Sequence, residues 1–173
     1  MPALKIRMWH FPKSIMTKLK DESTAKTGDT WISTYGATMG VLWKTITRAK
    51  LPLLNPDLDT KTILAHGLNT RAKMQPPLTD NFMGNAVALP RTEPRAIRDI
   101  LADGNLTEMA AAVRWPHPQF EGYCFILPSR AGMEAEGSDE GLEVIVCLEE
   151  SCHDRLFQDE ELQRYAQPRG FDA

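Results

Sequence analysis

Residues 32–50 of this protein, which decide its fold, read ISTYGATMGVLWKTITRAK. The apolar residues of this stretch recur at steps of three and four, which is the spacing of one face of an α-helix. They are Tyr35, Met39, Leu42, Trp43 and Ile46. The hydroxyls of Ser33 and Thr34 stand just before the pattern, where a side-chain oxygen can accept a hydrogen bond from an N–H of the first turn. The stretch is therefore predicted to form one buried amphipathic helix.

Two glycines and three basic residues refine this prediction. Gly36 and Gly40 each cost about 1 kcal/mol relative to alanine inside a helix, which suggests that a neighbouring backbone packs closely against them. Lys44, Arg48 and Lys50 lie toward the end of the stretch, where the helix dipole favours positive charge.

The remaining sequence is predicted to complete one α+β domain built on a mixed sheet, without internal repeats. Strands are expected where apolar residues alternate or form short runs, and helices where they recur at helical spacing. The expected strands are residues 4–11, 62–68, 85–89, 121–127 and 142–148, and the other expected helices are residues 14–20, 94–102, 106–114 and 151 to about 165.

Length, composition and charge limit the classes of protein to consider. The 173 residues suffice for one domain with a core. A net charge of −3 gives no electrostatic reason to expect nucleic acid or an anionic membrane as a partner. No run reaches the roughly 18 apolar residues that a membrane span needs. Three cysteines without metal-binding spacing favour a reducing compartment, so a cytoplasmic protein without a bound metal is expected.

Four segments, in order along the chain, resemble those of one enzyme family. After residues 32–50 come LNTRAKMQPPL (68–78) and NFMGNAV (81–87), and then FILP (125–128) with LEVIVCLEE (142–150). Together they resemble the C-terminal domain of BAHD-type acyl-CoA-dependent acyltransferases, in particular the fungal, trichothecene O-acetyltransferase-like members. The resemblance implies that residues 1–173 form a single C-terminal-type domain, which is half of a chloramphenicol-acetyltransferase-like two-domain fold.

The resemblance also implies an activity, which is transfer of an acyl group from acyl-CoA to a hydroxyl of a secondary metabolite. Acetyl is the acyl group expected, and no metal takes part. The family's general base is the histidine of an HxxxD motif, contributed by the N-terminal domain at the interface between the two domains. None of the four histidines begins such a motif here, and His117, in HPQFE, comes nearest. We therefore predict that the catalytic histidine is not in this chain.

A second family motif, DFGWG, is also missing from this sequence. In the family it lies between the helices that follow GNAV and the last strands. Here Arg114 is followed at once by Trp115 and Pro116. An internal deletion near residues 114/115 is therefore predicted.

The resemblance assigns a site to four residues of this sequence. Ser33 and Thr34 would lie near the acyl-CoA side of the channel, where a helix N-terminus can bind phosphate. The competing interpretation of these two residues is a plain helix cap. Arg71, in the segment matching GRSR, and Asn85, in the segment matching GNA, would lie beside the channel. The alternative for Arg71 is a solvated loop charge.

Two other classes of function stay open at this point. The chain could be a non-catalytic, truncated or degenerate half-domain that binds CoA or a partner chain, such as an N-terminal-type acyltransferase domain. It could also be an unrelated α+β binding domain. A half-domain on its own would expose the apolar face that its partner normally covers, which favours self-association.

Overall fold

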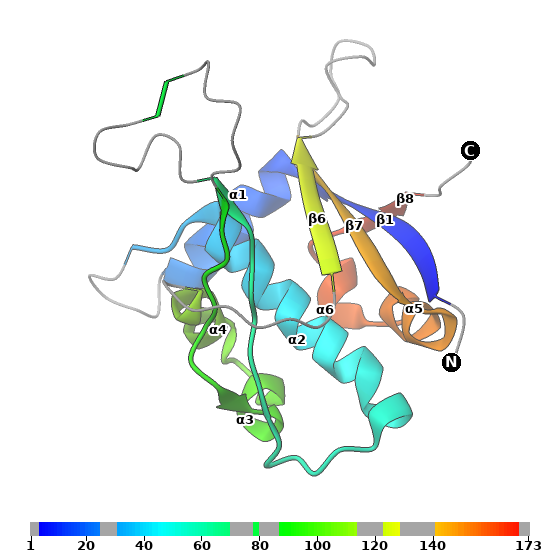
Figure 1. Ribbon diagram of the computed structural model, residues 1–173. Helices are drawn as coiled ribbons and strands as arrows, with labels where there is room; N and C mark the ends of the chain where they lie inside the picture. Colours follow the sequence, from blue (N-terminus) through cyan, green and yellow to red (C-terminus); the bar gives the residue numbers. More distant parts are fainter. Residues whose placement is uncertain are drawn as a thin grey trace.

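A four-stranded sheet packs against a layer of helices (Figure 1), in a computed structural model that describes residues 4–24, 31–69, 78–79, 87–113, 123–128 and 141–169. The strand order is β6-β7-β1-β8. The bounds are β1 Leu4–Pro12, β6 Tyr123–Pro128, β7 Gly141–Glu149 and β8 Gln167–Arg169. The predicted α+β class is confirmed.

The helices account for most of the remaining described chain. They are α1 Lys13–Thr24, α2 Thr34–Leu54, α3 Ile97–Leu101, α4 Leu106–Ala112, α5 Glu150–Phe157 and α6 Glu160–Gln163. Helix α2 runs through the centre of the layer in Figure 1, with α3 and α4 on one side of it and α5 and α6 on the other. Two short strand pairs form an arm beside α2. They join β2 Lys61–Thr62 to β5 Arg95–Ala96, and β3 Leu68–Asn69 to β4 Val87–Ala88.

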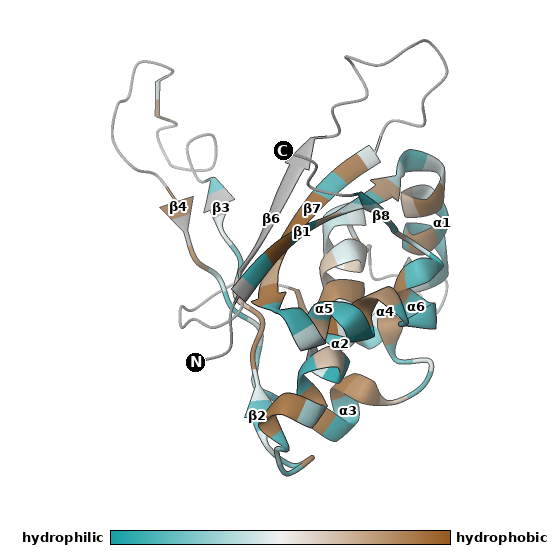
Figure 2. Cartoon of the chain, turned by 90° about the vertical axis from the view of Figure 1, so that its right-hand side faces the viewer, coloured by the Kyte–Doolittle hydropathy of each residue, from teal (hydrophilic) through white to brown (hydrophobic). Residues whose placement is uncertain are grey.

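The core lies between the sheet and α2. Strands β1 and β7 pair over nine residues, with Trp9 opposite Val144. Because directly opposed residues of an antiparallel pair point to the same face, Trp9 and Val144 share the face that packs on the helices. Both are fully buried, and the ring of Trp9 lies 5.3 Å from that of Phe157 on α5. Figure 2 shows the long hydrophobic stretch of β7 beside β1, whose hydrophobic and hydrophilic residues alternate.

Helix α2 approaches the backbone of α4 at the two glycines. A Cβ placed on Gly40 would lie 2.9 Å from the amide nitrogen of Ala110, and one on Gly36 would lie 3.2 Å from the carbonyl oxygen of Ala110. Atoms that close would push α4 away from α2. The close packing predicted from these glycines is confirmed.

The sheet differs from the prediction in its strand directions. Every pairing among the described strands is antiparallel, whereas a mixed sheet was predicted. The hairpin from β6 to β7 and the long β1–β7 ladder set these directions. The sequence pattern of a strand carries no information on the direction of its neighbour. The edge strand β8 was not predicted at all, because three residues are too few to show a period.

Two helix ends also differ from the prediction. Helix α2 continues through Pro52 to Leu54 and ends at Asn55, which adopts a left-handed conformation (φ 39°) and donates its N–H to the carbonyl oxygen of Leu51. A proline removes only one backbone hydrogen bond, and the last turn tolerates this loss. The predicted closing helix is two helices, because Asp159 caps α6 by accepting a hydrogen bond from the N–H of Leu162.

Candidate functional site

Ser33 forms the N-cap of helix α2, as predicted. Its backbone is extended (φ −77°, ψ 154°), and its Oγ accepts a hydrogen bond from the N–H of Gly36 at 2.9 Å. Its carbonyl oxygen accepts from the N–H of Ala37 at 3.0 Å. Thr34 is the first helical residue, and its carbonyl oxygen accepts from the hydroxyl of Thr38 at 2.9 Å. The structure therefore places Ser33 and Thr34 together at the positive end of a 21-residue helix.

An aromatic pair lies beside this first turn. The ring of Tyr35 lies 5.2 Å from the imidazole of His66, at an angle of 52°. Burial lowers the pKa of His66 below its ordinary value, so the ring is neutral near pH 7. Its Nδ1 is buried without a hydrogen-bond partner. His66 therefore adds no positive charge beside the first turn of α2.

A concave region lies on the helical layer, where α1, α2, the α3–α4 segment and the α5–α6 segment meet. It is an open cleft of about 850 Å³. Lys44, whose side chain is 3% exposed, lies 3.2 Å from Oε1 of Glu161. The guanidinium of Arg48 contacts Oδ2 of Asp159 at 2.5 Å and Oε2 of Glu161 at 2.8 Å. Lys44 and Arg48 are therefore already paired with carboxylates, which indicates that these two cations belong to a structural network.

The hydroxyl of Tyr165 completes this network. It donates to Oε2 of Glu22 at 3.1 Å. Burial, together with this hydrogen bond and the charge of Glu22, raises the pKa of Tyr165 to about 12. The phenol thus stays protonated at neutral pH and ties the C-terminal end of α6 to α1.

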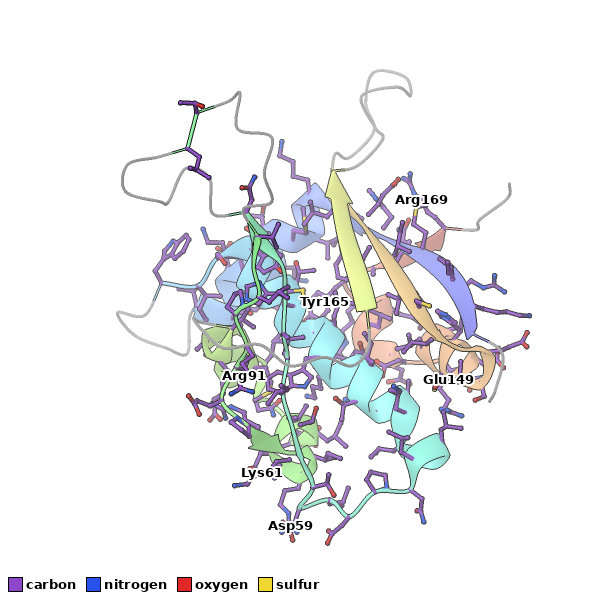
Figure 3. All side chains as sticks on the ribbon, viewed as in Figure 1. Asp59, Lys61, Arg91, Glu149, Tyr165 and Arg169 are labelled. Atoms are coloured by element: carbon purple, nitrogen blue, oxygen red, sulfur yellow. The ribbon has the colours of Figure 1, made fainter. Side chains whose placement is uncertain are left out.

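His153 and Cys152 are both buried and uncharged, and the described residues form no metal-binding cluster. Nε2 of His153 lies 3.0 Å from the carbonyl oxygen of Lys5, and burial lowers the pKa of this ring. Burial raises the pKa of the Cys152 thiol, which keeps it protonated. No group of three or more metal-ligating side chains comes together among the described residues. Figure 3 shows Asp59, Glu149 and Arg169 at three separate edges of the molecule.

Two of the four residues assigned from the sequence can be placed. Ser33 and Thr34 lie as described above, whereas Arg71 and Asn85 lie outside the described residues, as do His117 and the junction near residues 114/115. The network of Lys44 and Arg48 was missed. Its partners Asp159 and Glu161 come more than a hundred residues later, and no local pattern connects them. Within the described chain, no helix has the length and apolar character that crossing a membrane requires.

The fold is that of one half of a two-domain acyltransferase. The structure matches Fusarium sporotrichioides TRI101 complexed with coenzyme A and T-2, with a TM-score of 0.77 and 15% sequence identity, over 98% of this chain and 52% of that one. It matches vinorine synthase with a TM-score of 0.68 and 12% identity, over 96% of this chain and 49% of that one. The chain thus spans about half the length of these two structures.

The sequence itself identifies the family. Acetyltransferase FGR3 of Gibberella zeae is 30% identical over 113 residues, which are 62% of this chain and 22% of the relative. The profile of the Transferase family matches residues 8–114, more than half of the chain. The protein therefore belongs to the Transferase family, and its resemblance to fungal BAHD-type acyltransferases is confirmed.

Proposed function

We propose that this chain is the C-terminal-type half of an acyl-CoA-dependent acyltransferase that acylates a hydroxyl of a fungal secondary metabolite in the cytoplasm. The acyl group would be acetyl, as in the name of the FGR3 relative. The observation that supports this most is the match of nearly the whole chain to one half of TRI101, in a structure that contains coenzyme A and the mycotoxin T-2.

In the proposed reaction, a general base removes the proton of the acceptor hydroxyl while its oxygen attacks the thioester carbonyl carbon. The tetrahedral intermediate then collapses, the acyl ester forms, and CoA leaves as the thiol. None of the four histidines of this chain begins the HxxxD motif that holds the family's base, and His10 and His153 are in addition only 3% and 2% exposed. We therefore assign the base to an N-terminal-type acyltransferase domain that docks on this one.

The proposed contribution of this chain is to hold acyl-CoA at the first turn of α2. The N–H groups of a first helical turn lack partners within the helix, and together with the dipole they favour phosphate. Ser33 already accepts from one of them, so the cap and the phosphate would share the turn. Arg71 and Asn85 are proposed to complete the CoA site from the segments that follow.

Substitution of Ser33 tests this assignment of the CoA site. Ser33→Asp keeps a capping oxygen but adds a negative charge where the phosphate would bind. We expect it to retain the melting temperature and to lose CoA binding, measured by isothermal titration calorimetry. Ser33→Thr is the matched control, because it keeps both the cap and the neutral charge. Equal CoA affinity in all three proteins would contradict the assignment.

Thioester cleavage tests the need for a second domain. The chain is incubated with acetyl-CoA and an alcohol acceptor, alone and together with an N-terminal-type acyltransferase domain that carries HxxxD. We expect free thiol to be released only in the mixture. Release at the same rate by the chain alone would contradict our assignment of the base.

A second candidate function is a non-catalytic half-domain that binds CoA or a partner chain. The absence of both HxxxD and DFGWG from the sequence favours it. CoA binding without thiol release in the mixture would support this alternative. Size-exclusion chromatography adds a further distinction, because a monomer with one cooperative melting transition indicates a domain adapted to exist alone.

A further inference from the structure

Trp31 is exposed beside the first turn of α2. Its side chain is 69% exposed, more than any other large apolar residue in the part of the chain that the structure describes. By contrast, Trp9 and Trp43 are 0% and 4% exposed. A large aromatic ring left in water forgoes the favourable free energy of burial, so the exposed face of Trp31 is available to a flat, apolar ligand group.

A cation accompanies this ring. Nζ of Lys20, on α1, lies 5.5 Å from the centroid of the Trp31 ring, within the range of a cation–π contact. Because the indole remains 69% exposed, the ammonium covers only a small part of it. Trp31 and Lys20 thus present a flat aromatic surface and a positive charge at one place.

The distance to the proposed CoA site follows from the sequence. Trp31 precedes the N-cap Ser33 by two residues, and two residues of extended chain span at most about 7 Å. A ligand with a phosphate at the first turn of α2 would therefore have its adjoining groups within reach of the indole.

We propose that Trp31 stacks on the adenine base of CoA and that Lys20 pairs with a phosphate of the same nucleotide. A purine is flat and π-rich, and stacks on tryptophan without requiring directional hydrogen bonds. Lys20 forms no ion pair among the residues that the structure describes, so a phosphate of the nucleotide would supply the negative charge that pairs with it. This inference rests on the proposed function and extends it, because it assigns the nucleotide end of CoA to two residues outside the family-derived site.

Three probes separate the nucleotide end of CoA from its thiol end. CoA contains both, 3′,5′-ADP contains only the nucleotide, and pantetheine contains only the thiol arm. For Trp31→Ala we expect the dissociation constants of CoA and 3′,5′-ADP to rise at least about fivefold, as the loss of one base–aromatic stack predicts. The affinity for pantetheine should not change. Trp31→Phe keeps an aromatic ring and should retain most of the affinity.

Fluorescence gives a second, independent measurement. CoA should quench the emission of the wild-type protein more than that of Trp31→Phe, because the other described tryptophans are buried. Leu54→Ala is the matched control, because Leu54 is 62% exposed and lies at the opposite end of α2. For Lys20→Glu we expect weaker binding of CoA and of 3′,5′-ADP.

The outcomes distinguish this inference from the proposed function. If the wild-type protein binds CoA and Trp31→Ala binds it equally well, the assignment of Trp31 is wrong while the CoA site stands. If the wild-type protein binds neither CoA nor 3′,5′-ADP, both the CoA site and the assignment of Trp31 are wrong.

Discussion

Nζ of Lys44 lies 3.2 Å from Oε1 of Glu161, which joins the middle of α2 to the start of α6. The Lys44 side chain is 3% exposed and that of Glu161 is 21% exposed. Arg48, one turn further along α2, contacts the other oxygen of the same carboxylate. One carboxylate therefore contacts two cations of the central helix, and Asp159, which also contacts Arg48, supplies the second negative charge.

This arrangement predicts unequal costs for removing the two partners. Glu161→Ala would leave the buried ammonium of Lys44 unpaired, and we expect a loss of about 3–5 kcal/mol in the free energy of unfolding. Lys44→Met should cost much less, because Glu161 keeps Arg48 as its partner. Urea unfolding measures both, with Glu160→Ala as the control at an exposed neighbouring position. Equal losses for the two variants would show that the pair is not buried in solution.

The contact between Gly40 and Ala110 predicts an exception to helix propensity. Alanine is better than glycine in a helix by about 1 kcal/mol, yet a Cβ at residue 40 would lie 2.9 Å from a backbone nitrogen. We expect Gly40→Ala to lower the free energy of unfolding by about 1–3 kcal/mol, the usual cost of overpacking. Gly67→Ala is the control, since its Cβ would lie no closer than 3.8 Å to its nearest neighbour, Cγ1 of Val87. A stabilised Gly40→Ala protein would contradict the close approach of α4.

Protonation of His153 should destabilise the fold in mild acid. Burial lowers its folded-state pKa below 6.5, so the unfolded chain binds more protons in the interval between the two pKa values. The free energy of unfolding should therefore fall as the pH drops below about 6.5, by at most about 1.4 kcal/mol per pH unit for this group.

The matched variant for this measurement is His153→Gln, whose amide can still donate to the carbonyl oxygen of Lys5. Urea unfolding gives the free energy of unfolding of both proteins between pH 5 and pH 8. The difference between the two values at each pH excludes the contributions of His66 and the carboxylates, which are the same in both proteins. A difference that does not depend on pH would argue against a buried neutral His153.

Tyr165 should titrate well above the ordinary range for tyrosine. Its pKa of about 12 in the folded protein exceeds the value of about 10 in an unfolded chain. The stabilisation from the neutral phenol is thus present below pH 10 and is lost as the pH rises toward 12. Ultraviolet titration of the phenolate should show the highest-pKa tyrosine disappear in Tyr165→Phe. Its persistence in that variant would assign it to another tyrosine.

The sequence predicted the features that are set by residues close together in the chain, and it did not predict those that are set by segments far apart. The span of α2 as far as Lys50, its cap at Ser33 and the role of Gly40 follow from residues within a few turns of one another, and all were predicted. The pairing of Lys44 with Glu161, the strand β8 and the antiparallel directions depend on segments far apart in the chain. Periodicity cannot reveal them, because a lysine within a helix has the same local sequence pattern whether it is solvated or buried.

In the candidate site, too, the sequence identified some residues and missed others. Ser33 and Thr34 were found from their position before an amphipathic pattern, and the structure places them at the start of α2. The sequence around Trp31 contains nothing that separates an exposed tryptophan from a buried one. Only its 69% exposure distinguishes it from Trp43, which is buried as its helical spacing predicts.

The pairing of β1 with β7 has a consequence for biosynthesis. The 128 residues from 13 to 140 lie between the two strands. At about 5–20 residues per second, the ribosome needs on the order of ten seconds to synthesise the intervening chain. During that time Trp9 and Phe11 emerge without the strand that will flank them. The growing chain therefore presents a hydrophobic β-segment that chaperones can capture, and the central sheet can close only after translation has passed β7.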